Sequence, residues 1–253
     1  MTNQMRMQRR VLIARGGQPP REEKGPIMKK DLTELVFILD RSGSMGGLES
    51  DTIGGFNATL QKHRETKGDA VVSTVLFDNF TEVLHDRIAI GDVKNLTSKD
   101  YWVRGCTALL DAVGGSIKHI GRVHGYLPEE YRPEKTIFVI ITDGYENASR
   151  EYSYDRVKKM IEQKKEDGWE FLFLGANIDA IGEAEKIGIA ADRSVTYLAD
   201  DIGNQVAYEA IADATYEMRC APDMASVTGS WKTSIEKDVA KRGGKKHGIF
   251  GRR

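Results

Sequence analysis

The sequence has few cysteines and no long apolar run, and both absences narrow the kinds of protein it can be. Its 253 residues include two cysteines, Cys106 and Cys220, which lie far apart and match no metal-ligand spacing. A disulfide framework and a cysteine-based metal site are therefore not expected. No run of 18 apolar residues occurs, so the pattern predicts no membrane-spanning helix and no membrane partner.

A secretory signal and a strong net charge are also missing. The amino terminus is basic, but its apolar run covers only Val11–Ala14, which is too short for a signal peptide. Together with the lack of a disulfide framework, this predicts a cytoplasmic protein. The formal net charge is -1 and the pI is near 6.5, so a globally basic nucleic-acid binder is not indicated.

Composition divides the chain into three parts. Residues 1–30 are rich in turn formers and charges without sustained periodicity, which predicts a flexible amino-terminal arm. Residues 31–220 are predicted to form one domain. Residues 221–253 are predicted to be a carboxyl-terminal extension with a flexible basic tail. The tail fits either a solubilising terminus or an electrostatic contact with an acidic partner or nucleic acid.

Hydrophobic patterning alternates between strands and helices from residue 34 onward. The β-branched run Thr136–Thr142 is typical of a strand covered on both faces. Asp78-Asn79 predicts a turn that makes Thr81–Ile90 an antiparallel partner of the strand before it. The alternation therefore predicts a doubly wound α/β fold: a mostly parallel six-stranded sheet with helices on both faces and one antiparallel edge strand. The predicted strands are Glu34–Asp40, Ala70–Phe77, Thr81–Ile90, Thr136–Thr142, Glu170–Leu174 and Ser194–Tyr197. The predicted helices are Gly47–Lys67, Thr107–Val123, Ser153–Glu166, Asp179–Lys186 and Ile202–Met218.

Polar residues follow two of these strands. In the stretch "LVFILDRSGSM", an apolar strand runs into Asp40, and Ser42 and Ser44 follow at alternate positions. Asp143 follows the fourth predicted strand, and Thr107 opens a helix. Ligands of doubly wound sheets bind beyond the carboxyl ends of the strands, where the strand order reverses. We therefore expect Asp40 and Asp143 to lie side by side at that edge.

These side chains have the chemistry of a hard-cation site. Two carboxylates and three hydroxyls, without an imidazole, suit Mg²⁺, Ca²⁺ or Mn²⁺ better than zinc or copper. Because the hydroxyls add no charge, the ion would attract a further carboxylate from outside. Each residue also has a simpler interpretation: Asp and Ser at this spacing are common in turns, and Thr107 fits a helix N-cap.

The same residues resemble the von Willebrand factor A (vWA) domain family, which has the integrin I-domain fold. Its metal-ion-dependent adhesion site (MIDAS) uses D-x-S-x-S, a distant threonine and a distant aspartate. The resemblance covers about residues 32–220. It implies that the protein ligands of Mg²⁺, or of Mn²⁺ or Ca²⁺, are Asp40, Ser42, Ser44, Thr107 and Asp143.

The resemblance also implies a kind of partner. In this family an Asp or Glu of a protein partner completes the metal shell. The chain is most similar to stand-alone cytoplasmic bacterial members associated with tellurite resistance, which implies an AAA+ ATPase or a stress-resistance complex as the partner. A nucleic-acid partner is not expected, except through the basic tail.

Residues next to the motifs leave several roles open. Asp111 lies one turn into the predicted helix, where the dipole favours a carboxylate, although support of the metal ligands also fits. Tyr145–Asn147 suit either partner contacts or an ordinary loop. Cys106 stands where family members frequently have glycine, and nothing beside it argues for an activated thiolate.

An enzyme is the alternative prediction: a Mg²⁺-dependent phosphatase or hydrolase using the same metal site. A phosphatase of the haloacid dehalogenase type needs a second aspartate where this chain has Ser42. The sequence also has no phosphate-binding glycine loop and no obvious general base. A cation-dependent protein interaction module that is not an enzyme is therefore the main prediction.

Overall fold

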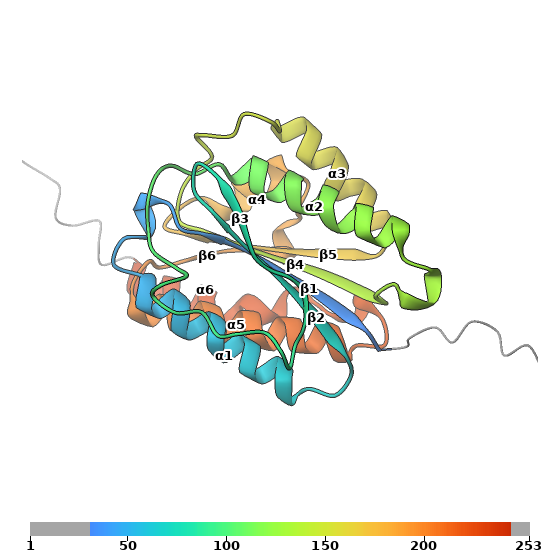
Figure 1. The fold of residues 1–253 in the computed structure, drawn as a ribbon. Coiled ribbons are helices and arrows are strands. Elements are labelled where there is room, and N and C mark those ends of the chain that lie inside the picture. Colours follow the sequence, from blue (N-terminus) through green and yellow to red (C-terminus); the bar gives the residue numbers. More distant parts are fainter. Residues whose placement is uncertain (1–30, 244–253) are drawn as a thin grey trace, which may run out of the picture.

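The computed structural model describes residues 31–243 and places one six-stranded sheet between two layers of helices (Figure 1). The strand order is β3-β2-β1-β4-β5-β6. All neighbouring strands are parallel except β2 and β3, which pair antiparallel at one edge. The predicted fold class is confirmed. The predicted arm at residues 1–30 and the tail residues 244–253 lie outside the described part of the chain.

Every predicted helix and strand is present, and the largest displacement of an end is from Val123 to Tyr126. The strands are β1 Thr33–Asp40, β2 Ala70–Phe77, β3 Thr81–Ala89, β4 Lys135–Thr142, β5 Trp169–Ala176 and β6 Ser194–Tyr197. The α-helices are α1 Glu49–Glu65, α2 Leu109–Tyr126, α3 Tyr154–Glu166, α4 Ala180–Lys186, α5 Asp201–Cys220 and α6 Thr233–Arg242. Short 3-10 turns cover Gly43–Met45, Glu129–Tyr131, Ala191–Arg193, Met224–Ser226 and Gly229–Lys232.

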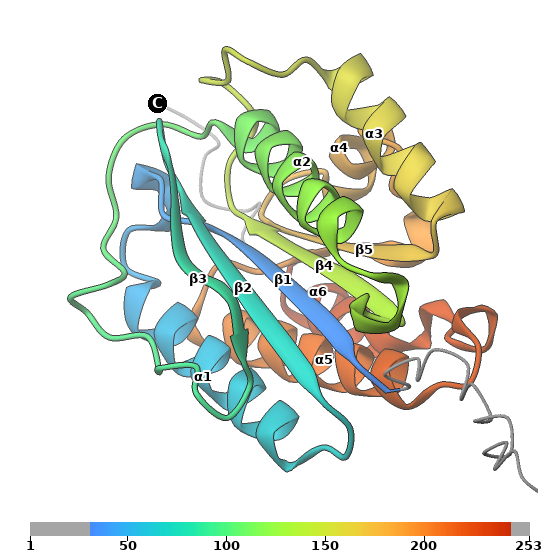
Figure 2. The same cartoon turned by 45° about the vertical axis from the view of Figure 1, so that its right-hand side comes forward.

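The central strands are covered on both faces. Helices α1, α5 and α6 pack on one face, and α2, α3 and α4 pack on the other (Figures 1 and 2). On β1, Leu35, Phe37 and Leu39 join one core, whereas Val36 and Ile38 join the other. Burial on both sides explains the uninterrupted apolar runs. It also gives the loops beyond the carboxyl ends of β1 and β4 a rigid base.

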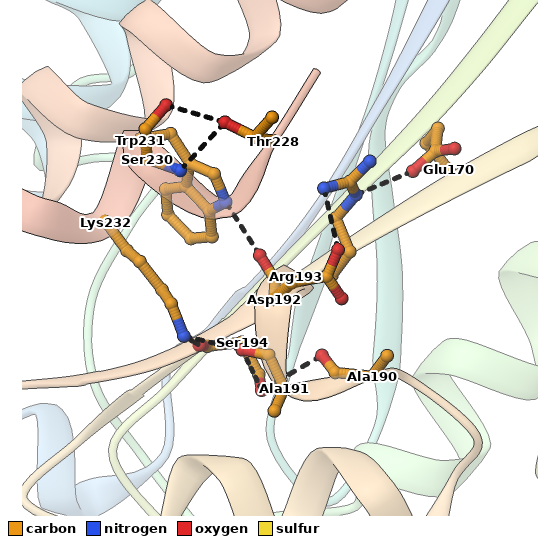
Figure 3. A network of polar contacts seen from close by, with 10 residues as sticks. All are labelled: Glu170, Ala190, Ala191, Asp192, Arg193, Ser194, Thr228, Ser230, Trp231 and Lys232. Carbon is orange, nitrogen blue, oxygen red and sulfur yellow. Dashed lines mark hydrogen bonds and ion pairs between the residues drawn. The ribbon is translucent and has the colours of Figure 1, made fainter. Parts of the chain in front are cut away.

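The packed chain continues past residue 220, where the sequence analysis ended the domain. Helix α6, which was not predicted, packs against β6 and α5. The turn before it is held by the indole N–H of Trp231, which donates to the carbonyl of Asp192 at 3.0 Å (Figure 3). Lys232 Nζ donates to the carbonyl of Ala191 at 2.6 Å. These contacts fix the segment against the start of β6 and direct α6 toward the opposite, carboxyl edge of the sheet.

A buried histidine joins α1 to α5. The Nε2 atom of His63 lies 2.9 Å from the Thr215 hydroxyl, and Nδ1 lies 3.0 Å from Nη1 of Arg219. A guanidinium can only donate, so Nδ1 accepts and the ring is neutral. Burial, and secondly the charge of Arg219, lower the pKa of His63 to about 3.

This histidine should make stability depend on pH. The unfolded imidazole binds a proton below its ordinary pKa of about 6.5, and the folded one does not until about pH 3, so stability falls as the pH drops through this window. We expect His63 to lower the free energy of unfolding by about 2 kcal/mol between pH 7 and pH 5. Urea denaturation of the wild type and of His63→Gln at both pH values isolates this contribution, since all other groups cancel. The same pH dependence in both proteins would contradict it.

Candidate metal centre

The structure brings all five predicted side chains together at the carboxyl edge of the sheet. β1 and β4 are neighbours, so the residues that follow them meet. The Thr107 hydroxyl donates to Ser42 Oγ at 3.1 Å, and Ser42 Oγ lies 3.0 Å from Ser44 Oγ. Ser44 Oγ donates to Asp143 Oδ1 at 2.6 Å. With Asp40 bonded to the backbone of Ser42, the five residues form one continuous polar group.

The loop after β1 is folded so that alternate side chains point to one centre. Ser42 N–H donates to Asp40 Oδ1 at 2.7 Å, which turns the chain directly after the strand. The next three residues form a 3-10 turn that is anchored by buried Met45. Gly43 N–H donates to the carbonyl of Gly105 at 3.1 Å and ties this turn to the segment that carries Thr107.

The two carboxyl groups of the site are harder to ionise than ordinary carboxyl groups. Asp40 is buried, and this burial raises its pKa to about 6, although hydrogen bonds from Thr142 and Ser42 act in the opposite direction. Burial likewise raises the pKa of Asp143, and its hydrogen bond from Ser44 lowers it. A buried carboxylate beside a half-buried one is costly without a cation. The donor set is therefore one that a divalent ion would stabilise.

Thr142 supports the site, and the sequence analysis did not single it out. Its hydroxyl donates to Asp40 Oδ2 at 2.6 Å and accepts from Gly144 N–H at 3.2 Å. Thr142 is the last residue of a β-branched strand, so its sequence signal was that of a strand former. Its position directly before Asp143 is the one sequence feature that could have identified it as part of the site.

Gly144 leaves space for the hydroxyl oxygens of Thr107 and Ser44. A Cβ atom at this position would stand 2.8 Å from Thr107 Oγ1 and 3.3 Å from Ser44 Oγ. Any larger residue would crowd two of the five predicted ligands.

Gly144→Ala should therefore weaken the binding of Mg²⁺. We expect a loss of about 10- to 100-fold, comparable with the effect of disturbing the support of metal ligands. Titration calorimetry measures the affinity, and circular dichroism checks the fold. Gly115→Ala is a matched control, because a Cβ at Gly115 meets nothing within 4 Å. Equal affinities for the two variants would refute the steric argument.

Asp78 ties three segments of this edge together. Its Oδ2 atom accepts from Arg41 Nε at 2.9 Å and from Arg104 Nε at 2.6 Å. Its Oδ1 atom accepts from Phe80 N–H, and its carbonyl accepts from Ala108 N–H. One buried carboxylate thus joins the loop after β1, the turn after β2 and the segment that leads into α2.

Glu146 caps helix α2 from the loop after β4. Its carboxylate accepts the N–H groups of Leu110 and Ser149 at 2.9 and 2.7 Å. Asn147 Oδ1 accepts the Thr107 N–H at 3.0 Å. The N-cap residue of α2 is Ala108, without a side-chain cap bond. The interpretation of Thr107 as an N-cap is therefore wrong, and its hydroxyl donates to Ser42 Oγ instead.

Asp111 has a structural role next to the site. It lies in the first turn of α2, as predicted, and its carboxylate accepts the N–H groups of Arg150, Glu151 and Tyr152 at 2.8 to 2.9 Å. Thus Glu146 and Asp111 fix the loop that begins with Asp143. Tyr145, which the sequence also left open, is 52% exposed.

The site depends on hydroxyl oxygens. Within residues 31–243, no group of three or more His, Cys, Asp or Glu side chains is placed to hold a metal ion. The thiol of Cys106 is exposed. No helix in this same range is both long and apolar enough to cross a membrane.

Comparison with known proteins shows the fold. No protein-family model and no curated protein matches the sequence. Among solved structures, crystal form 2 of proximal thread matrix protein 1 from the mussel byssus is similar to this chain. The sequence identity is 15%, the TM-score is 0.54, and the match covers 73% of this chain and 46% of that chain. The same protein with a zinc-occupied MIDAS motif has 14% identity, a TM-score of 0.51 and coverage of 75% and 47%. The manganese-loaded TRAP protein of Plasmodium vivax has 15% identity, a TM-score of 0.47 and coverage of 70% and 72%. The chain spans slightly less than half of the mussel protein, and the fold they share is the vWA-type α/β fold.

Proposed function

We propose that this chain is a divalent-cation-dependent protein interaction module. Asp40, Ser42, Ser44, Thr107 and Asp143 would hold the ion, and a carboxylate of a protein partner would complete its shell. The observation that carries this proposal is the unbroken chain of hydrogen bonds from Thr107 to Asp143, which links four of the five ligands at one edge of the sheet.

The spacing of these oxygens supports a small hard cation. Successive oxygens in the chain lie 2.6 to 3.1 Å apart. Neighbouring ligands in an octahedron around Mg²⁺ are separated by about 3 Å, against about 3.4 Å around the larger Ca²⁺. Mg²⁺ or Mn²⁺ could thus replace the hydrogen bonds with little movement. The zinc-occupied MIDAS motif of the mussel protein, which has the same fold, also supports a divalent ion here.

The charge of the site favours an acidic partner. Asp40 and Asp143 balance a divalent ion, whereas the three hydroxyls leave its attraction for anions largely unsatisfied. The bound ion would supply that attraction for a partner's Asp or Glu. The cytoplasmic location and the AAA+ ATPase or stress-resistance partner remain proposals from the family resemblance.

Binding is favoured over hydrolysis by the state of the nearby carboxylates. Asp78, Glu146 and Asp111 each have a carboxylate that accepts from guanidinium or backbone N–H groups. They are therefore committed to holding loops and are poor candidates for a general base. A hydrolase would need such a base beside the ion.

Affinity purification from the native host tests the proposal. The immobilised chain should retain a partner in Mg²⁺, release it in EDTA, and fail to retain it as Asp143→Ala. Asp86→Ala is the matched control, because Asp86 is an exposed aspartate paired with His119. Turnover of a phosphate ester that is lost in Asp40→Ala would instead support the hydrolase.

Protons should compete with the metal at Asp40. Since burial raises the pKa of Asp40 to about 6, most of this carboxyl is ionised at pH 7 and most is protonated at pH 5. Metal ligands must be deprotonated, so the affinity for Mg²⁺ should fall about tenfold from pH 7 to pH 5. Calorimetric titrations at both pH values measure this, and an affinity that does not change would contradict it.

A further inference from the structure

We infer that the partner segment lies along the carboxyl edge of the sheet. Its metal-bound acid would have an apolar residue on the β2 side and a basic residue on the β6 side. The apolar side chain would rest on an aromatic platform formed by Phe80, Trp102 and Arg104. This inference rests on the proposed function and assigns the chemistry of the flanking residues.

The aromatic platform is exposed next to the metal centre. Phe80 is 74% exposed in the turn between β2 and β3, and Trp102 is 45% exposed in the segment before α2. β2 pairs with β1. Arg104 N–H donates at 2.8 Å to the carbonyl of Arg41, which is the residue directly after Asp40. The platform therefore borders the ligand loop on the β2 side.

Contacts hold Trp102 and Arg104 in place, and Asp78 links Arg104 to the backbone of Phe80. The Arg104 guanidinium lies 4.4 Å from the centre of the Trp102 ring, and buried Arg41 lies 5.8 Å from it. Arg104 is itself fixed by the salt bridge to buried Asp78. Exposed Trp and Arg side chains dominate the energetics of many interfaces, and preorganisation lowers the entropic cost of binding.

The other side of the metal centre is acidic. A groove of about 550 Å³ begins at Ser44 and Asp143 and continues past the ends of β5 and β6 to Asp200 and Asp201. Arg242 at the end of α6 already pairs with Asp200 at 2.8 Å, so Asp201 beside it supplies the negative charge that a basic side chain would meet. An acidic flank would be repelled here and a basic flank attracted.

The strand order sets which side of the metal centre each flank would meet. The sheet runs β3-β2-β1-β4-β5-β6, so the platform and the acidic side lie on opposite sides of the β1–β4 metal centre. The occupant is thus an extended protein segment in which Asp or Glu stands between an apolar residue and Lys or Arg.

A display library of peptides tests this, with a fixed central Glu and four random residues on each side. Selection on the Mg²⁺-loaded full chain should enrich aromatic or aliphatic residues on one flank and Lys or Arg on the other.

Phe80→Ala and Trp102→Ala should each weaken a selected peptide by about five- to thirtyfold. Tyr126→Ala is the control, because this exposed tyrosine ends α2, far from the helix end that meets the metal centre. Trp102 also reports binding by fluorescence, since Trp169 and Trp231 are buried.

The outcomes separate this inference from the proposed function. Peptides that need Mg²⁺ and Glu but show no flank preference, or that bind Phe80→Ala and Trp102→Ala normally, would overturn the inference alone. If peptides bind only after residues 244–253 are deleted, that segment is the occupant of the platform. If the chain forms a Mg²⁺-dependent dimer that Phe80→Ala abolishes, a second copy is the occupant. Either result overturns the inference. Recovery of no Mg²⁺-dependent peptide would count against both.

Discussion

Replacing Asp40 with asparagine should abolish Mg²⁺ binding and leave the domain folded. Asparagine has the same shape, and its carbonyl can still accept the Ser42 N–H that shapes the turn. It lacks the negative charge that a hard cation requires. Because burial raises the pKa of Asp40 to about 6, the wild-type carboxylate is ionised at pH 7 at a cost to stability. Without metal, Asp40→Asn should therefore be as stable as the wild type or more stable, by up to about 3 kcal/mol.

Thermal melts with and without Mg²⁺ give the measurement. At a concentration of one hundred times Kd, the ion should stabilise the wild type by about 2.7 kcal/mol. For a domain of this size, that corresponds to a rise in Tm of roughly 5 to 11 °C. Asp40→Asn should show no rise, whereas Asp86→Asn, an exposed aspartate outside the site, should show the full rise. An equal rise in Asp40→Asn would exclude Asp40 as a ligand.

The fold was predictable because its central elements have strong local signals. β4 is a β-branched run, and both of its faces are buried as that pattern predicts. Helix α6 has a weaker signal, because Ile235 and Val239 are the two large apolar residues among its ten. The turn that leads into α6 is held by a tertiary contact, the bond from Trp231 to Asp192, which no local pattern reveals.

The motif residues of the candidate site could be predicted from the sequence. The residues that hold the loops of the site in place were harder to predict. Asp40 and Asp143 could be paired because parallel strands end at one edge of the sheet. The roles of Asp78 and Glu146 could not be found, since the side-chain and helix partners that define those roles lie 26 to 37 positions away in the sequence. The error about Thr107 has the same origin: a distant glutamate performs the capping that a local rule assigned to the nearest hydroxyl.

Asp78 is the residue outside the ligand set whose loss should cost most. Burial alone would raise its pKa, but hydrogen bonds from Arg104, from the Phe80 N–H and from Arg41 outweigh burial and hold the pKa below its usual range. The carboxylate is therefore ionised at neutral pH. Its contribution to stability is present above the unfolded pKa of about 3.9 and is lost as the pH falls through the lower folded value.

Asp78→Ala should destabilise the domain by about 3–5 kcal/mol, because it leaves the buried guanidinium of Arg41 without its buried partner. Glu82→Gln is the matched control: Glu82 also pairs with Arg41, at 2.7 Å, but it is 52% exposed and should contribute less than about 1 kcal/mol. Urea denaturation at pH 7 compares the two, and equal losses would contradict the role of burial.

At a temperature where Asp78→Ala stays folded, its Mg²⁺ affinity should also fall about 10- to 100-fold, since the loops that carry Ser42 and Thr107 lose their common anchor. Glu82→Gln keeps that anchor and should bind Mg²⁺ like the wild type, so calorimetry distinguishes a positioning role from a general loss of stability.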